Sequence, residues 1–460
     1  MGAQRGINAG GRIERLPFTR FKYLLYGTLM FIFTAEALDN GLTGTTLSTV
    51  DKAFNANPGL YAVASTVGVV IGLVFAGALQ DVIGRKRPLF IANGIAALFA
   101  FAATFSPNYS TLVTLRVCQG FGLGMIFVIV PATISEWALG ASRGRGFAWM
   151  DIGLQIGQMV VPFLSLFIMV PFPVNIGWKN MYYFAGAVSL VAFAASFALP
   201  ESVRWLESRG RAERAENIMK KIEERVSREL HSPLPQVTKT YEVTGKRARP
   251  FTELFNWKVF RQTLLVMCSS VAIYSIFYLL QVFQPTWLVY AGLKLNVALE
   301  FTTITLFFTL FGKYLGGYLG DRIGRRATLL TFIFIGAVFL EVTGLFRTIA
   351  VGVMIGTIVT NFFIQGSAPI QKAFSAEPFS SGSRGSGYAV IDGSARAIGG
   401  ILVPYLFASV LGTAAFGTYA LVLAIIAVAL ALTTYAFAKE TGKVTVEEAA
   451  VTTSAIQVNA

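Results

Sequence analysis

The chain has 460 residues, of which 54% are hydrophobic and only 13% are charged, whereas a soluble domain usually carries about 25% charged residues. Its formal charge of +14 comes from 38 basic and 24 acidic residues, with a single histidine. His231 stands alone in a polar stretch, no metal-ligand cluster is evident, and no nucleotide-binding loop is found. We therefore expect no enzyme, no catalytic residue, no bound metal and no cofactor.

Twelve apolar stretches follow one another along the chain. A hydrocarbon core about 30 Å thick needs about 20 apolar residues in a helix. The first stretch is too long for a signal peptide and contains Glu36 and Asp39. Buried helices of a soluble protein would be shorter and show a polar stripe, so we expect an all-α membrane protein. The stretches are 23–47, 60–80, 88–106, 109–134, 146–170, 180–199, 262–289, 296–319, 327–345, 348–373, 386–410 and 413–437.

The basic residues between these stretches predict the orientation. With the N-terminus inside, 31 of the 38 Lys and Arg residues lie in inner segments and four in outer segments. This asymmetry follows the positive-inside rule, so the basicity orients the protein in the lipid bilayer and does not indicate nucleic-acid binding. We expect a multi-pass protein of the cell membrane, with both termini cytoplasmic, and a monomer by default.

An internal repeat divides the chain. GALQDVIGRKR at 77–87 returns as GYLGDRIGRRA at 317–327, and a second constellation around Glu136 returns 241 residues later around Glu377. Two constellations at one offset indicate a duplication of six helices, and two such halves leave a cavity on their common axis. The predicted parts are a cytoplasmic tail 1–22, a bundle 23–199, a cytoplasmic linker 200–261 with an amphipathic helix near 218–230, a bundle 262–438 and a tail 439–460.

The repeated residues predict gating and structural roles. We expect Gly77 and Gly317 to let helices approach closely, and Gly84 and Gly324 to permit tight reversals. The charged members are expected to form ion-pair networks at the inner ends, which break when the halves rock. These members are Asp81, Arg85, Glu136, Arg143 and Asp151 in the first half and Asp321, Arg325, Glu377, Arg384 and Asp392 in the second.

The two repeated strings resemble the loop motif of the major facilitator superfamily. RVCQGFGLGMIFVIVPATISEWALGASRGRG at 116–146 is similar to the fourth-helix signature of its sugar porter and metabolite branches, and PESVRWLESRGR at 200–211 to the start of their central loop. Val82 departs from the motif, which usually has Arg there; Arg322 restores it in the second copy. The resemblance covers 20–438 and implies twelve transmembrane helices in two six-helix pseudo-repeats, with transport by alternating access.

The seventh helix helps to choose the branch. CSSVAIYSIFYLLQVFQPTWLVYAG lacks the Gln-Gln…Gly…Asn pattern of sugar porters. It resembles the organic-ion, nicotinate and aromatic-acid transporters, as does AEPFSSGSRGSGYAVIDGSARAIGGILVP at 376–404. The resemblance favours proton-coupled symport of a small organic acid or related metabolite. Symport of a sugar or polyol, export by proton antiport, and a transport-dead sensor stay open.

Charges at membrane depth are functional candidates by default. Related sugar porters carry a proton-coupling pair at the positions of Asp39 and Arg116, so the resemblance implies that Asp39 takes the proton and Arg116 controls its release. A static ion pair is the alternative. Glu36, three residues before Asp39, joins them as a candidate.

Polar side chains on helix faces predict the substrate site. Arg396 either contacts an anionic substrate or pairs with Asp392 one turn earlier, and Lys313 either contacts an anion or reaches the inner surface. Amide side chains facing lipid would be costly, so they are expected to face a cavity. The predicted substrate-binding residues are Gln155, Gln158, Tyr274, Tyr278, Gln281, Gln284, Asn361, Gln365 and Arg396.

Overall fold

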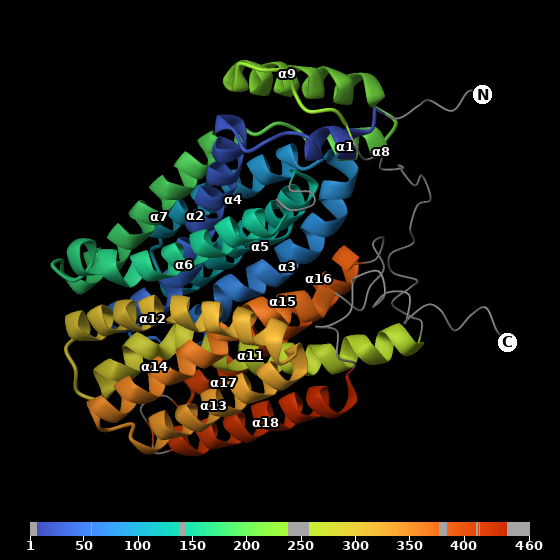
Figure 1. Ribbon diagram of the computed structural model, residues 1–460. Helices are drawn as coiled ribbons and strands as arrows, with labels where there is room; N and C mark the ends of the chain where they lie inside the picture. Colours follow the sequence, from blue (N-terminus) through green and yellow to red (C-terminus); the bar gives the residue numbers. More distant parts are fainter. Residues whose placement is uncertain are drawn as a thin grey trace.

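The chain folds into two helical bundles side by side, as the computed structural model in Figure 1 shows. It describes residues 7–56, 58–137, 143–237, 257–376, 384–410, 413 and 415–438, and within these it contains helices and no strand. The six long helices of the N-half are α2 (Arg20–Phe54), α3 (Gly59–Ile83), α4 (Lys86–Thr104), α5 (Tyr109–Trp137), α6 (Arg143–Ile168) and α7 (Val174–Ser196).

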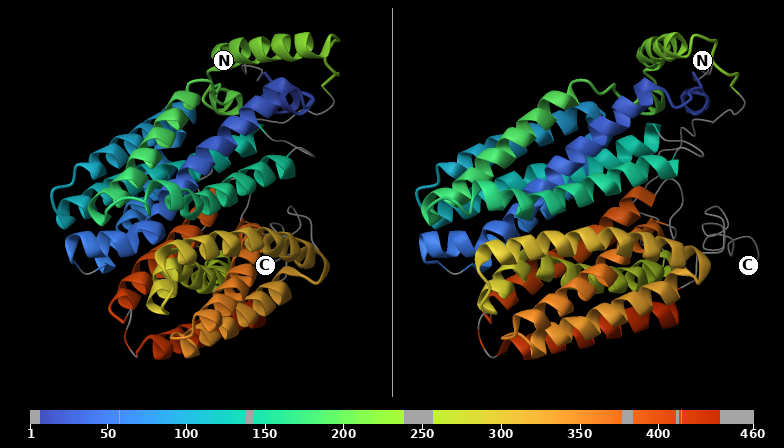
Figure 2. Two further views of the ribbon diagram at one scale, coloured as in Figure 1. Left: turned by 90° about the vertical axis from the view of Figure 1, so that its left-hand side faces the viewer. Right: turned by 60° about the vertical axis from the view of Figure 1, so that its left-hand side comes forward.

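The C-half repeats this order with two of its helices divided. Its members are α11 (Trp257–Tyr290), α12 (Leu295–Arg322), α13 (Arg325–Leu345), α14 (Ala350–Gly366) with α15 (Ala368–Ala376), α16 (Arg384–Ala397) with the π-helical turn η2 (Ile398–Leu402) and α17 (Val403–Ala408), and α18 (Ala415–Phe437). In Figure 2 the two bundles stay distinct in both views.

Corresponding helices pack alike in the two halves, which supports the predicted duplication. Helix α3 lies along α5 as α12 lies along α14, and α4 lies along α7 as α13 lies along α18. Eleven helices in the described residues are long and apolar enough to cross a bilayer. The twelfth member is α7, which has 23 residues. The predicted all-α membrane fold of twelve helices is therefore confirmed.

Two of the four motif glycines serve as expected and two do not. Gly84 and Gly324 have φ angles of 98° and 112°, which favour glycine and permit the tight reversals before α4 and α13. The expectation for Gly77 and Gly317 is wrong, because a Cβ at either position would meet nothing within 4 Å. The halves touch more closely at Gly44 of α2, where a Cβ would lie 2.0 Å from the carbonyl oxygen of Gln281 on α11.

Three short helices form a cap beside the N-half. They are α1 (Ala9–Glu14), α8 (Val203–Ser208) and α9 (Ala212–Leu230), and α9 buries the apolar side chains of Met219, Ile222 and Val226. We call the end of the bundle where α2 begins, near this cap, the cap end, and the opposite end the far end. Figure 1 shows α9 lying across the N-half, away from the C-half.

Ion pairs fasten the cap. Glu223 of α9 accepts hydrogen bonds from Arg12 Nη2 at 2.6 Å and Arg15 Nη2 at 2.6 Å, and Arg12 also pairs with Glu216. Burial works against the charged form of Glu223, but the two arginines hold its pKa below the usual value. Residues 7–19, which the sequence predicts only as part of a tail, therefore pack against the N-half and the cap.

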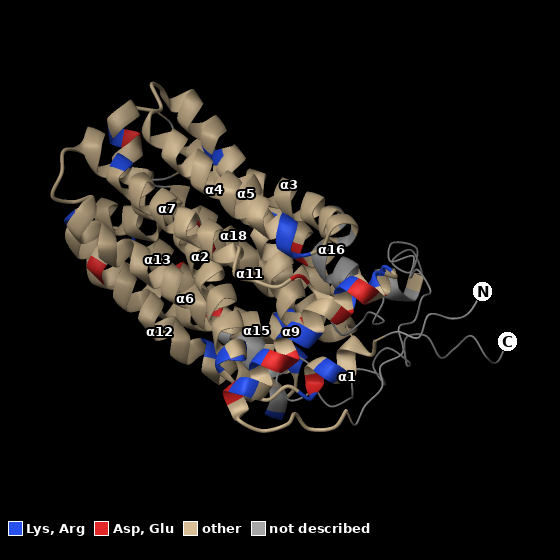
Figure 3. Ribbon diagram, turned by 90° about the horizontal axis from the view of Figure 1, so that it is seen from above, with Lys and Arg blue, Asp and Glu red and all other residues tan. Residues whose placement is uncertain are grey.

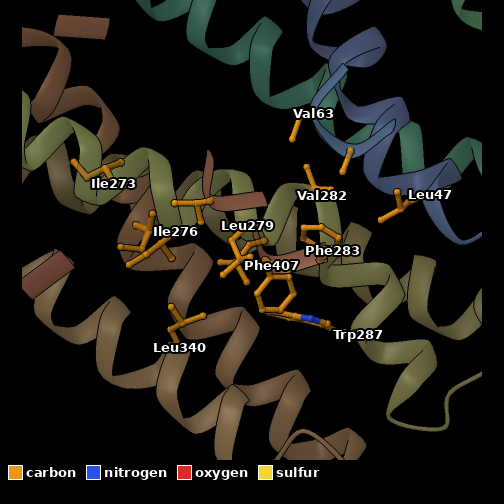
Figure 4. Close-up of a cluster of buried hydrophobic side chains, with 14 of the residues drawn as sticks. Leu47, Val63, Ile273, Ile276, Leu279, Val282, Phe283, Trp287, Leu340 and Phe407 are labelled. Atoms are coloured by element: carbon orange, nitrogen blue, oxygen red, sulfur yellow. The ribbon is translucent and has the colours of Figure 1, made fainter. Parts of the chain in front are cut away.

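Apolar packing joins the halves at the far end. One buried cluster includes residues of both halves, and Figure 4 shows Leu47 and Val63 of the N-half beside Val282 of the C-half. A second cluster, near the cap end, contains residues of the N-half and of the cap. Figure 3 shows charged residues gathered around α1, α9 and the ends of α15 and α16. The far end is thus closed by apolar contacts and the cap end is polar.

Candidate functional site

A small cavity lies between the halves. Its volume of about 30 Å³ holds one or two water molecules and is too small for an organic solute, so the halves enclose it tightly in this conformation. Its walls come from α2, α6, α11, α12 and α14, and it contains no charged residue. The lining residues are Gly41, Thr45, Gln158, Pro162, Phe277, Leu280, Gln281, Gln284, Pro285, Thr302, Leu306, Asn361 and Gln365.

Several amide groups at this cavity have no hydrogen-bond partner among the described residues. Both side-chain polar atoms of Gln281 are buried without one, as are Nε2 of Gln284 and Oε1 of Gln158. Each such group costs about 1–3 kcal/mol, and buried polar groups without partners are rare in native proteins. The cavity wall therefore offers donors and acceptors to a ligand.

A row of amides on α11 and α14 fixes one side of the cavity. Asn361 Nδ2 donates to Gln284 Oε1 at 2.9 Å, and Gln365 Nε2 donates to Asn361 Oδ1 at 3.0 Å. Five of the predicted substrate-binding residues thus line one cavity: Gln158, Gln281, Gln284, Asn361 and Gln365.

Asp39 and Arg116 are both fully buried in the N-half, and Gln119 lies between them. Gln119 Nε2 donates to Asp39 Oδ1 at 2.5 Å, while Arg116 Nη1 donates to Gln119 Oε1 at 2.9 Å. Ser189 Oγ donates to Asp39 Oδ2 at 3.1 Å. The predicted pair is therefore connected through the side-chain amide of Gln119.

Sequence reasoning missed Gln119 and Ser189. Gln119 stands three residues after Arg116 on α5. This spacing places both side chains on one helix face, so the sequence indicates that they are neighbours. Ser189 comes from α7, and nothing in the sequence links it to Asp39.

A chain of hydroxyl groups continues from Arg116 toward the far end. The guanidinium lies 5.5 Å from the ring centroid of Tyr182. The Tyr182 hydroxyl is 2.7 Å from that of Tyr61, which is 2.5 Å from Thr46 Oγ1. These buried side chains extend the polar interior of the N-half to α3, which contributes Tyr61.

Arg396 occupies a second buried polar cluster, where the halves face each other. Its Nε donates to Asp392 Oδ2 at 2.7 Å and its Nη1 to the Tyr278 hydroxyl at 2.8 Å. Tyr274 also hydrogen-bonds Asp392. In this conformation Arg396 thus pairs with Asp392 of its own helix, which is one of the two alternatives that the sequence left open.

The N-half contributes to this cluster as well. The guanidinium of Arg396 lies 4.2 Å from the ring centroid of Phe127 on α5. Glu36 is buried and interacts with Arg396, Asp39 and Asn40. Tyr274, Tyr278 and Arg396 therefore form a site distinct from the amide-lined cavity.

Gln155 lies beneath the cavity and not in its wall. Its Nε2 donates to the Leu306 carbonyl at 2.8 Å and to Thr309 Oγ1 at 2.6 Å, and its Oε1 accepts from Lys313. Lys372 of α15 pairs with Asp151 of α6. These contacts tie the halves together on the cap-end side of the cavity.

The loop motif forms an ion pair within the N-half. Arg85 Nε lies 2.8 Å from Glu136 Oε1, and the Glu201 carboxylate accepts from the backbone N–H of Arg85 at 2.8 Å at the start of α4. Glu201, which the sequence analysis did not single out, thus caps this helix. Arg325 begins α13. Among the other predicted gating residues, Glu377 and the side chains of Asp81, Arg143, Asp321 and Arg384 lie outside the described residues.

This architecture, with two six-helix halves enclosing a polar cavity, defines a transporter of the major facilitator superfamily. The model of the Sugar (and other) transporter family matches residues 32–452, and the chain belongs to this family.

Curated relatives include transporters of several substrates. The chain is 25% identical over 398 residues to the niacin transporter NiaP of Acinetobacter baylyi, covering 85% of this chain and 88% of that protein. It is 28% identical over 307 residues to the putative metabolite transport protein YdjK of Escherichia coli, covering 65% of this chain and 66% of that protein. The matched segment thus spans about two thirds of YdjK.

Solved structures agree in fold. A partially occluded inward-open structure of the xylose transporter XylE from E. coli superimposes with a TM-score of 0.74 at 17% identity, covering 92% of this chain and 99% of that one. The chain is therefore a multi-pass membrane transporter, and the comparisons leave its substrate open.

Proposed function

We propose that the protein is a proton-coupled symporter of a small organic acid or related metabolite, working by alternating access in the cell membrane. The observation that carries the proposal is the buried Asp39–Gln119–Arg116 unit, which places a carboxylate in the N-half without a direct cationic partner. Such a group is costly to keep charged in a nonpolar interior, so it is suited to exchange a proton when the halves move.

The acid specificity rests on Arg396. This residue is buried between the halves, and its partners Asp392 and Tyr278 are side chains that a substrate carboxylate can replace. A guanidinium binds carboxylates in a paired geometry. The similarity to a niacin transporter over 85% of the chain supports this substrate class.

The same proposal orients the chain. Because the inner segments of the predicted topology carry most of the lysines and arginines, the cap end and both termini are cytoplasmic. The conformation with apolar closure at the far end then corresponds to a path closed toward the outside.

A second candidate, symport of a sugar or polyol, is favoured by a specific observation. The cavity between the halves is lined by five amide side chains and no charged residue, and amides and hydroxyls suit an uncharged polyhydroxy ligand. Similarity to the myo-inositol transporter IolT of Bacillus subtilis, 30% identical over 37% of the chain, points the same way.

Uptake into proteoliposomes with an inside-alkaline pH gradient tests the proposal. The labelled panel contains nicotinate, benzoate, a short hydroxy acid, xylose and myo-inositol. Accumulation of an acid by the wild type, lost in Asp39→Asn while exchange persists, is the expected result. Accumulation of a sugar or polyol alone supports the second candidate, and acid accumulation at the wild-type level by Asp39→Asn refutes the assigned role of Asp39. Efflux of a labelled compound that occurs only when the pH gradient is reversed identifies an exporter.

A further inference from the structure

Two matched faces lead from the cavity to the cap end, one on each half. In both, the spacing of four, three and four residues keeps the side chains on one side of a helix. Because α6 and α12 run in opposite directions, the cavity-lining members meet at one end of the faces and the charged members at the other. From cavity to cap end, the members are Pro162, Gln158, Gln155 and Asp151 on α6, and Thr302, Leu306, Thr309 and Lys313 on α12.

Among the described residues, the charged end of these faces has two ammonium groups and one carboxylate. Lys313, Lys372 and Asp151 interact electrostatically, and Asp151 forms an ion pair with Lys372. The partner of the Lys313 ammonium among the described residues is the neutral amide oxygen of Gln155. A partly buried ammonium is stabilised much more by an anion than by an amide, so this place has capacity for one further carboxylate.

We propose that Lys313 forms a carboxylate-binding subsite for the substrate between the cavity and the cap end, separate from Arg396. The inference rests on the proposed transport of an organic acid. Gln155 closes the cavity floor by holding Thr309 and Lys313 across the halves. When α6 and α12 part at the cap end, this contact breaks and Lys313 faces the opened path, where it receives the carboxylate as the acid leaves or enters.

Lys372 keeps the subsite open to substrate. By pairing with Asp151, it occupies a carboxylate that also interacts electrostatically with Lys313. The subsite thus takes a monovalent organic anion as a point-charge partner, without selecting the rest of the molecule.

Transport measured separately from each face tests the proposal. Nicotinate uptake is compared in inside-out membrane vesicles, which present the cap end, and in right-side-out vesicles, with nicotinamide as the uncharged competitor. We expect Lys313→Gln to raise the KM for nicotinate at the cap end about tenfold, to leave the KM at the far end unchanged, and to leave inhibition by nicotinamide unchanged. Lys313→Arg should stay close to the wild type, and Lys220→Gln on the exposed face of α9 is the control for a lost surface charge.

Chemical rescue separates charge from packing. In a background of Cys118→Ser and Cys268→Ser, which removes both native cysteines, Lys313→Cys is treated with an aminoethyl thiosulfonate or with a neutral methyl reagent of the same class. The aminoethyl reagent restores an ammonium and is expected to restore the low KM at the cap end, whereas the neutral reagent is not.

The outcomes distinguish two failures. If the wild type carries nicotinate or benzoate but Lys313→Gln keeps the wild-type KM at both faces, the Lys313 subsite is refuted and the proposed function stands. Equal losses for both faces, without rescue by the aminoethyl reagent, likewise refute the subsite and leave Lys313 as a brace for Gln155. If the wild type carries myo-inositol or xylose and no acid, the proposed function fails and the subsite with it.

Discussion

The contact between Gly44 and Gln281 predicts that one methyl group changes the conformational equilibrium. A Cβ at position 44 would lie 2.0 Å from the Gln281 carbonyl oxygen, so Gly44→Ala forces α2 and α11 apart by about 1.4 Å to reach an ordinary contact of 3.4 Å. Overpacking of this kind costs about 1–3 kcal/mol. Because the cost applies only while the far end is closed, we expect the open-to-closed ratio at the far end to rise about 5- to 150-fold.

The assay is the labelling rate of a buried thiol at the same contact. Val282→Cys, introduced after replacement of both native cysteines by serine, places a thiol where 4% of the side chain is exposed. A membrane-impermeant maleimide added at the far end should label it at least fivefold faster in Gly44→Ala. Gly27→Ala on the same helix is the matched control, since its Cβ would meet nothing within 4 Å. Equal labelling rates in the two variants, with both monodisperse after purification, would refute the reasoning.

Three further predictions concern the polar networks. Gln119→Leu removes the bridge between Asp39 and Arg116, so pH-driven accumulation of a labelled acid should fall about tenfold or more in proteoliposomes; wild-type accumulation contradicts the assigned coupling. Glu136→Gln removes the negative charge 2.8 Å from Arg85 Nε and should lower the thermal midpoint in detergent by a few degrees, as about 1 kcal/mol or more is lost; an unchanged midpoint counts against the pair. Arginine contacts lower the pKa of Glu223, so its stabilising contribution is present above the unfolded pKa of about 4.3 and disappears as the pH falls through the lower folded value. The hydrogen-exchange protection factors of α1 should fall at that pH, and at neutral pH in Glu223→Gln; protection factors that do not change with pH contradict this.

Local sequence patterns predicted the architecture of the protein well and predicted the contacts between its helices less well. Apolar stretches of membrane length and two motif copies at one offset sufficed for twelve helices in two halves, because the bilayer fixes helix length and the duplication fixes the order. The motif glycines show what local sequence patterns can and cannot predict. Gly84 and Gly324 act through their own backbone, which sequence reveals. The close approach expected at Gly77 and Gly317 depends on a neighbouring helix, and it occurs at Gly72 and Gly316 of the same helices.

The candidate site shows the same division. Amide side chains on α11 and α14 were identified from their spacing, and five of the predicted residues do line one cavity. Two contacts could not be predicted without knowing which helices face each other. They are the hydrogen bond from Gln119 to Asp39 and the hydrogen bond from Lys313 to Gln155, which lies outside the cavity wall. Repeat mates also diverge: Asp392 pairs with Arg396 inside its own helix, while Asp151 reaches Lys372 in the opposite half.

The cap has a mechanical consequence. Its helices contact one another and α2, and its ion pairs join α1 to α9, so the cap moves as one body with the N-half. A rocking motion of the two halves is therefore converted into a displacement of α9 relative to α15 and α16. The distance between two spin labels, one on the exposed face of α9 and one on α15, would therefore report each opening at the cap end without a label in the transport path.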